Sequence, residues 1–248
     1  MRFPCCVLTI VLGGMFLVAM SSSTLVTAQE KPAQAKQARP NPALQPIEED
    51  PNLPRVLLIG DSISMGYTLP VRELLKGKAN VVRPNTNCGP SSRGVESLEQ
   101  WLGKGKWDVI HFNFGLHDLV YFAENGKDRA EKTTPGARHQ VPLPQYEANL
   151  RKIVARLKQT GAKVIWASTT PVPEGSANRA ADESVLFNEV AAKIMQENQI
   201  EIDDLHTYAK AKLAEIQLPK NVHFSPEGSK VLAKKVAEVV ESHLPKRP

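Results

Sequence analysis

Apolar and polar positions alternate in blocks along the chain from Pro54 onward. Short apolar runs typical of buried strands are separated by segments in which apolar residues recur with helical spacing. The runs predict strands at 55–60, 80–84, 107–115, 162–171 and 200–205. The periodic segments predict helices at 71–77, with Pro70 in the first turn, and at 95–103, 146–161, 184–198 and 226–244. Ser225 is the expected N-cap of the last helix and Pro226 its first residue.

Strands that alternate with helices predict an α/β fold, in which a parallel sheet is covered on both faces. In such sheets, ligands bind at the carboxyl ends of the strands. We therefore expect the informative residues directly after each strand.

Four polar or glycine-rich corners occupy these positions. They are Gly60-Asp61-Ser62 after the first strand, 85–94 after the second, 115–118 after the third, and 221–228 after the fifth strand and a short helix. Hydrolysis of an ester needs a nucleophile, a base and hydrogen-bond donors for the oxyanion. The four corners offer side chains for each of these roles.

Ser62 supplies a hydroxyl on a turn where its own backbone N–H can point at the same spot. Gly89 can bring a second N–H close, because it has no Cβ. His117 can donate a third hydrogen bond from a ring nitrogen. His223 lies just ahead of the last helix, where it can take the serine proton.

With "GDSIS", "NCGPSSRG", "GLHD" and "NVHFSPEG" at the four corners, the chain resembles the SGNH (GDSL-type) hydrolase family from about Pro54 to Leu244. Its members are esterases, lipases and carbohydrate deacetylases with a flavodoxin-like three-layer α/β/α sandwich. The resemblance implies this fold with a five-stranded, mainly parallel sheet, and cofactor-independent catalysis. It also implies Ser62 as nucleophile, His223 as base, and Ser62 N–H, Gly89 N–H and His117 as the oxyanion hole.

Two positions depart from the family pattern. His117 stands where the third motif usually has Asn, and Lys220 stands where an Asp usually precedes the histidine base by three residues. A lysine cannot accept the Nδ1–H bond that orients an imidazole. We expect a Ser-His dyad with a backbone carbonyl as acceptor. Asp203, Asp204 and Glu227 are the alternative acceptors.

The remaining histidines and the cysteine have simpler interpretations. His206 follows the fifth strand and is the rival candidate for the base, whereas His111 lies within the third strand and is expected to pack in the core. His139 and His243 are expected to be solvated, and Cys88 to be a small buried apolar residue. No cluster has metal-ligand spacing, so we predict no metal and no cofactor.

The segment 119–144 is longer than an ordinary connection. Two aromatic side chains in it can stack on a sugar ring, and three basic side chains can meet an acidic group. These are Tyr121 and Phe122, and Arg129, Arg138 and His139. The alternative is a mobile, solvated excursion.

The pattern of residues at the N-terminus is typical of a targeting segment. Arg2 precedes an apolar run too short for a comfortable membrane span, and small residues ending at Ala28 form a cleavage pattern. We therefore predict a signal peptide at 1–28, a disordered Pro- and Gln-rich linker at 29–53, and a hydrolase-type domain at 54–248. An uncleaved membrane anchor is the alternative.

The composition and charge of the chain limit the kinds of partner that we expect it to bind. Of 248 residues, 42% are hydrophobic and 23% charged, and 31 Lys and Arg against 26 Asp and Glu give a mild net charge of +5. No basic stripe is interleaved with aromatics, so we expect no nucleic-acid partner. Cys5 and Cys6 are removed with the signal peptide, so Cys88 is expected to form no intrachain disulfide. Because cleavage also removes the apolar segment, we expect no stable membrane insertion of the mature chain.

The chain is thus expected to be an exported serine esterase. It would cleave short acyl esters, such as acetyl groups on carbohydrates, through an acyl-Ser62 intermediate. The alternative is a catalytically impaired module that binds a glycan or a partner protein through the same cleft. In an active enzyme, Ser62 Oγ and His223 Nε2 should lie within about 2.6–3.2 Å of each other.

Overall fold

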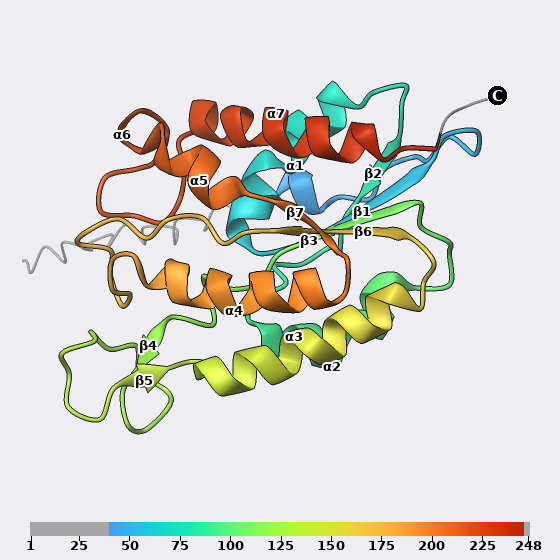
Figure 1. Cartoon of the computed structure of the whole chain (residues 1–248). Coiled ribbons are helices and arrows are strands. Elements are labelled where there is room, and N and C mark those ends of the chain that lie inside the picture. The colour runs from blue at the N-terminus through green and yellow to red at the C-terminus, as the bar shows by residue number, and fades with distance from the viewer. Residues whose placement is uncertain (1–39, 246–248) are drawn as a thin grey trace, which may run out of the picture. The chain divides into compact units, whose positions relative to one another are not determined.

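A parallel sheet forms the centre of the computed structural model, which describes residues 40–245. Its five strands have the order β2-β1-β3-β6-β7, and every neighbouring pair is parallel (Figure 1). The strands are β1 (Arg55–Ile59), β2 (Asn80–Val82), β3 (Val109–Phe112), β6 (Lys163–Ala167) and β7 (Glu201–Asp203). The predicted α/β class and the five predicted strands are confirmed.

Helices cover both faces of this sheet (Figure 1). On one face α1 (Ser62–Leu74) packs against α7 (Pro226–Ser242). On the other face α3 (Leu143–Lys158) packs between α2 (Ser91–Leu102) and α4 (Glu183–Glu197). The result is the predicted three-layer α/β/α sandwich.

Smaller elements lie between these. They are the 3₁₀ helix η1 (Pro42–Leu44), the antiparallel hairpin of β4 (Tyr121–Phe122) and β5 (Arg138–His139), and the short helices α5 (Leu205–Lys210) and α6 (Leu213–Ile216). The first long helix starts at Ser62, earlier than expected, so Pro70 lies in its interior and not in its first turn.

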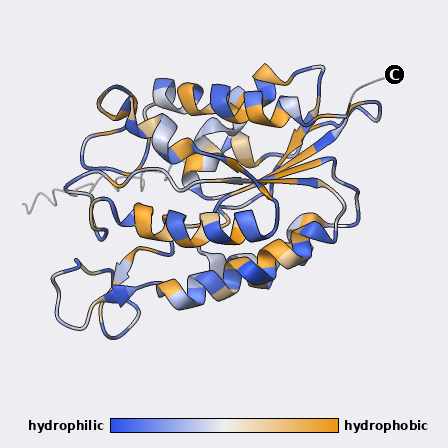
Figure 2. Cartoon of the chain, viewed as in Figure 1, coloured by the Kyte–Doolittle hydropathy of each residue, from blue (hydrophilic) through white to orange (hydrophobic). Residues whose placement is uncertain are grey.

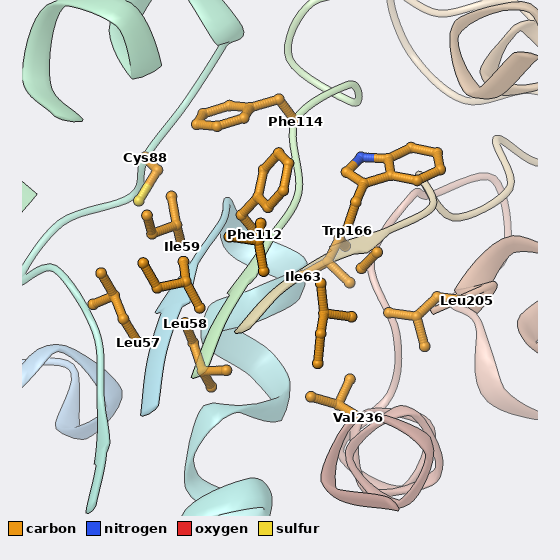
Figure 3. Close-up of a cluster of buried hydrophobic side chains, with 14 of the residues drawn as sticks. Leu57, Leu58, Ile59, Ile63, Cys88, Phe112, Phe114, Trp166, Leu205 and Val236 are labelled. Atoms are coloured by element: carbon orange, nitrogen blue, oxygen red, sulfur yellow. The ribbon is translucent and has the colours of Figure 1, made fainter. Parts of the chain in front are cut away.

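The core explains why the strands read as continuous apolar runs. Leu57, Leu58 and Ile59 are each at most 1% exposed, because helices cover both faces of β1. Phe112 and Trp166 continue this core on β3 and β6 (Figure 3). Figure 2 shows the same contrast between hydrophobic strands and helices of mixed character. Cys88 is fully buried in this cluster, as predicted.

The predicted linker is wrong from residue 40 onward. Ala43 is only 2% exposed, Glu49 pairs with Arg55 at 2.5 Å, and Asp50 N–H donates to the Asn80 side chain at 2.9 Å. Residues 40–53 therefore pack on the domain. The predicted signal peptide and the rest of the linker lie outside the described residues. Among the helices at 40–245, none has the length and apolar character needed to span a bilayer.

The start of α7 is fixed by two local features. Ser225 Oγ accepts the Gly228 N–H at 2.9 Å, which makes Ser225 the N-cap as predicted. Gly228 itself lies against α6, where a Cβ would come within 2.0 Å of the Ile216 carbonyl oxygen. The chain between α6 and α7 carries His223, so this contact also holds the corner that bears the predicted base.

We predict that Gly228→Ala destabilises the domain, because the new methyl group meets backbone that cannot rotate away. The expected loss is about 1–3 kcal/mol in the free energy of unfolding, measured by denaturant titration. Lys234→Ala, an exposed position on the same helix, is the matched control and should change the midpoint little. Equal midpoints for both variants would show that the α6–α7 contact is not tight.

Candidate active site

Ser62 occupies the turn that joins β1 to α1. Asp61 is the N-cap of α1, and its Oδ1 accepts the Ile63 N–H at 2.9 Å. Ser62 is thus the first helical residue, a position whose N–H has no partner inside the helix. Within the described part of the chain, this N–H has no hydrogen-bond acceptor. The corner therefore presents both the Ser62 hydroxyl and a free donor.

A buried guanidinium holds this corner against the second one. Arg83 is 6% exposed, and its Nη2 donates to the Gly60 carbonyl at 3.1 Å and to the Thr86 carbonyl at 3.3 Å. Its Nη1 donates to Ser64 Oγ at 3.2 Å. This role of Arg83 has no signal in the sequence, because an arginine at the end of a strand usually points to solvent.

His223 lies in a tight turn ahead of α7. The Leu218 N–H donates to the His223 carbonyl at 2.9 Å, and the buried Gln217 Nε2 donates to the Val222 carbonyl at 3.2 Å. The turn carries the imidazole to the β1–α1 corner, where His223 Nε2 lies 2.8 Å from Ser62 Oγ. The structure thus brings the predicted nucleophile and base within hydrogen-bond distance.

Asn221 orients this imidazole. Its Oδ1 lies 2.7 Å from His223 Nδ1 and accepts the His223 backbone N–H at 3.0 Å. Because the backbone group can only donate, the side-chain atom facing both nitrogens is the amide oxygen, and Nδ1 carries a proton. A neutral imidazole then leaves Nε2 free to accept the Ser62 hydroxyl proton. The three side chains form a Ser-His-Asn constellation.

The expected acceptors for Nδ1 are therefore wrong. No backbone carbonyl of residues 40–245 takes this role, and the three candidate carboxylates are engaged elsewhere. Asp203 bonds His111 at 3.0 Å, Asp204 accepts from Ser168 and Thr207, and Glu227 pairs with Lys230. The sequence did not point to Asn221, because the residue that orients a catalytic imidazole is usually a carboxylate. Its position two residues before His223 was the available signal.

The predicted oxyanion donors differ in availability. Gly89 has a φ of +66°, which favours glycine, but its N–H donates to Asn87 Oδ1 at 2.9 Å. Contrary to expectation, this donor is occupied. The Ser62 N–H and the ring of His117 have no hydrogen-bond partner within residues 40–245.

His117 is half-buried beside these groups. Burial lowers the pKa of His117, Asp61 opposes this, and the positive charges of Arg179 and Arg129 lower the pKa further. The ring is therefore neutral at neutral pH and can donate one hydrogen bond. His117 thus offers the same kind of donor as the Asn that it replaces.

The third corner is tied to the second by Asp118, which is fully buried. Its Oδ1 accepts the Ser91 N–H at 2.9 Å and also bonds the Ser91 hydroxyl, at the start of α2. Burial raises the pKa of Asp118 to about 7, although the Ser91 bonds oppose this. The "GLHD" and "NCGPSS" motifs are therefore joined through one carboxyl group.

The other histidines do not reach Ser62. His111 is buried as predicted, but it is paired with Asp203 across β6. The rival base His206 has a buried Nε2 with no hydrogen-bond partner in the described part of the chain. His139 bonds Glu183 at 3.0 Å and His243 lies against Glu201, so the expectation that both are solvated is wrong.

The segment 119–144 is anchored, and not a free excursion. Glu183, at the start of α4, accepts from the Tyr121 hydroxyl at 2.6 Å, Lys132 Nζ at 2.8 Å and His139 Nε2 at 3.0 Å. Tyr121 is 6% exposed, so it is not available to stack on a sugar as predicted. Phe122 remains half-buried.

Within residues 40–245, no group of three or more His, Cys, Asp or Glu side chains is arranged to hold a metal ion.

Comparison with known proteins assigns the family. The model of the GDSL-like lipase/acylhydrolase family matches residues 58–231, more than half of the chain. The chain belongs to this family. It is therefore a serine ester hydrolase with the SGNH-type fold, as the four motifs indicated.

Individual relatives of this GDSL-like hydrolase are distant. A GDSL esterase/lipase, CPRD49, of Arabidopsis thaliana is 25% identical over 77% of this chain and 80% of its own length. An arylesterase of Vibrio mimicus is 22% identical over 77% of this chain and 90% of its own length. The solved structure of Axe2, an acetylxylan esterase from Geobacillus stearothermophilus, superposes with a TM-score of 0.59 at 20% identity. The superposition covers 76% of this chain and 93% of the Axe2 chain, and it supports the α/β fold described above.

We predict that Asn221→Ala lowers kcat about ten- to a hundredfold, because His223 loses the acceptor that fixes its tautomer and orientation. Asn221→Asp should retain most of the activity. Its added negative charge stabilises the imidazolium, so the acid limb of its pH–rate profile should move to higher pH. Steady-state rates on a chromogenic ester from pH 4 to 9 check both. Full activity in Asn221→Ala would contradict the orienting role.

We predict that His117→Ala lowers kcat about 10²–10³-fold, because one oxyanion donor is removed while the Gly89 N–H is occupied. His117→Asn keeps a side-chain donor at the same corner and should recover most of the activity. Stopped-flow or steady-state kcat values measure the difference. Equal activity in the alanine and asparagine variants would mean that the ring does not touch the oxyanion.

Proposed function

We propose that this chain is an exported esterase that removes short acyl groups, such as acetyl, from carbohydrates through an acyl-Ser62 intermediate. The observation that carries the proposal is the 2.8 Å contact between Ser62 Oγ and His223 Nε2, with Asn221 behind the imidazole. This contact lies within the range expected of an active enzyme and favours it over a binding module.

In the first half-reaction, Ser62 Oγ attacks the ester carbonyl carbon while its proton passes to His223 Nε2. The carbonyl oxygen becomes an oxyanion that the Ser62 N–H and the His117 ring bind. His223 then gives the proton to the leaving alcohol oxygen as the C–O bond breaks. The acyl group remains on Ser62 Oγ.

In the second half-reaction, water attacks the acyl carbon and gives its proton to His223. The bond to Ser62 Oγ breaks, the proton returns to that oxygen, and the carboxylic acid leaves. Through both steps Asn221 accepts the Nδ1–H, so the ring does not turn away from Ser62.

The exposure of the catalytic side chains supports a bulky, polar substrate such as a carbohydrate. Asn221 and His223 are exposed and Ser62 is half-buried, so a bulky sugar can reach the hydroxyl without entering a deep apolar tunnel. The fold shared with the acetylxylan esterase Axe2 is consistent with an acetyl group. The N-terminal apolar segment supports export of the chain. Polysaccharide substrates are accessible to an exported enzyme.

We predict that the chain from residue 29 hydrolyses 4-nitrophenyl acetate, and that Ser62→Ala and His223→Gln each abolish this activity. His206→Gln is the matched control, since His206 is the rival base and does not touch Ser62; it should remain active. A fluorophosphonate probe should label wild type and not Ser62→Ala, as read by intact-mass spectrometry. A folded wild type that neither hydrolyses the ester nor reacts with the probe would overturn the proposal.

A further inference from the structure

Two arginines flank the oxyanion corner. Arg179 Nε donates to the Leu116 carbonyl at 2.8 Å, which places its guanidinium beside His117. Arg129 comes from the segment 119–144. Its backbone lies next to that of Arg179, because the neighbouring Asn178 Nδ2 donates to the Ala130 carbonyl at 3.3 Å.

The contact between these two segments is reinforced on both sides. The Tyr121 N–H donates to the Asn178 carbonyl at 2.8 Å, and Glu131 accepts the Asn178 N–H at 3.1 Å. The anchoring of the same segment by Glu183 fixes it from the α4 side. Both arginines are therefore attached to hydrogen-bonded backbone next to the site.

Neither guanidinium has an acidic partner in the part of the chain that the structure describes. This contrasts with Arg151 and Arg156, which pair with glutamates at 2.5–2.8 Å. Nearby acids are already engaged: Glu131 with Asn178, and the buried Asp61 as the cap of α1.

The two charges also act on each other. Burial lowers the pKa of Arg179 and the positive charge of Arg129 adds to this, so that the pKa falls to about 10 although Asp61 opposes the shift. Both arginines lower the pKa of His117 as well. Like charges held near each other without a salt-bridge partner favour the binding of an anion.

We propose that Arg129 and Arg179 form a subsite for an anionic group of the substrate, a carboxylate or a sulfate, close to the ester that Ser62 attacks. The inference rests on the proposed esterase function and deepens it. The natural substrate is then an acylated acidic carbohydrate, such as a uronate or a sulfated sugar, and not a neutral one.

The chemistry of the two side chains fits this role. A guanidinium offers paired N–H donors that match the oxygens of a carboxylate or a sulfate, and such charge-assisted bonds are stronger than neutral ones. Arg179 Nε is used by Leu116, which leaves its two terminal nitrogens for the ligand. Arg129 is exposed and can close on the anion from the opposite segment.

The test uses matched aryl acetates that differ only in charge. These are 3-acetoxybenzoate, its neutral methyl ester and 3-acetoxybenzenesulfonate. We expect kcat/KM to be at least tenfold higher for one anionic substrate than for the methyl ester at low salt. The anionic substrate with the higher kcat/KM shows whether the subsite prefers a carboxylate or a sulfate-like group. The preference should shrink at about 0.5 M NaCl, because salt screens the charges.

Arg129→Gln and Arg179→Gln should each bring the ratio of anionic to neutral kcat/KM toward one, and the double variant should abolish the preference. Lys152→Gln is the matched control, since Lys152 is an exposed cation on α3, away from the corner; its ratio should equal that of wild type. A ratio near one in wild type, or a ratio that both arginine variants leave unchanged, would overturn the subsite.

A binding measurement separates this inference from the proposed function. Calorimetry with Ser62→Ala should show tighter binding of 3-acetoxybenzoate or the sulfonate than of the methyl ester, and Arg179→Gln in the same background should remove the difference. Hydrolysis of the neutral ester without an anion preference overturns the subsite alone. Absence of hydrolysis with arginine-dependent anion binding overturns the esterase and keeps the anion site.

Discussion

The packing of α1 against α7 is the contact on which the site depends. Ser62 begins one of these helices and His223 lies just before the other, so the two residues meet although 161 positions separate them in the chain. The sheet makes this possible, because its parallel strands direct every following corner to the same edge. Gly228 lets the start of α7 approach α6, and Arg83 fastens the Ser62 corner to the next one.

An amide in place of a carboxylate changes how the imidazole is held. Asn221 accepts the Nδ1–H, so the tautomer and the ring orientation are set as an Asp would set them. It brings no negative charge to stabilise the imidazolium that forms during each proton transfer. The site therefore relies more on geometry and on the oxyanion donors. Of these, the Ser62 N–H and His117 are free, while Asn87 holds the Gly89 N–H.

Local patterns predicted the sheet, the long helices and the placement of Ser62, Gly89, His117 and His223 at one edge. The elements follow from the apolar periodicity, and the site placement follows from the rule that loops after parallel strands lie at one edge of the sheet. What escaped prediction depends on side chains that meet across the fold. His111 reaches Asp203 across β6, and Tyr121 reaches Glu183 on α4. No spacing along the chain specifies such pairs.

The same limit explains the errors at the site. Whether the Gly89 N–H is free depends on the rotamer of Asn87, and the partner of His223 depends on how the turn folds back on itself. Residues 40–53 look like a linker by composition, yet they pack because Asn80 and Arg55 offer them partners. In each case the outcome depends on side-chain hydrogen bonds that form only in the folded chain.

Of the two departures from the usual family pattern, one changes the charge near the site and the other does not. A Lys at position 220 stands where the family usually has a negative charge. His117 adds no charge at neutral pH, because burial and the neighbouring arginines lower its pKa. Arg129 and Arg179 add two further positive charges without carboxylate partners in the described part of the chain. Positive charges beside a cleft raise the local concentration of anions there. With Lys220 in place of the usual Asp and two arginines beside the oxyanion corner, the charges near the site agree in sign with the proposed anion subsite.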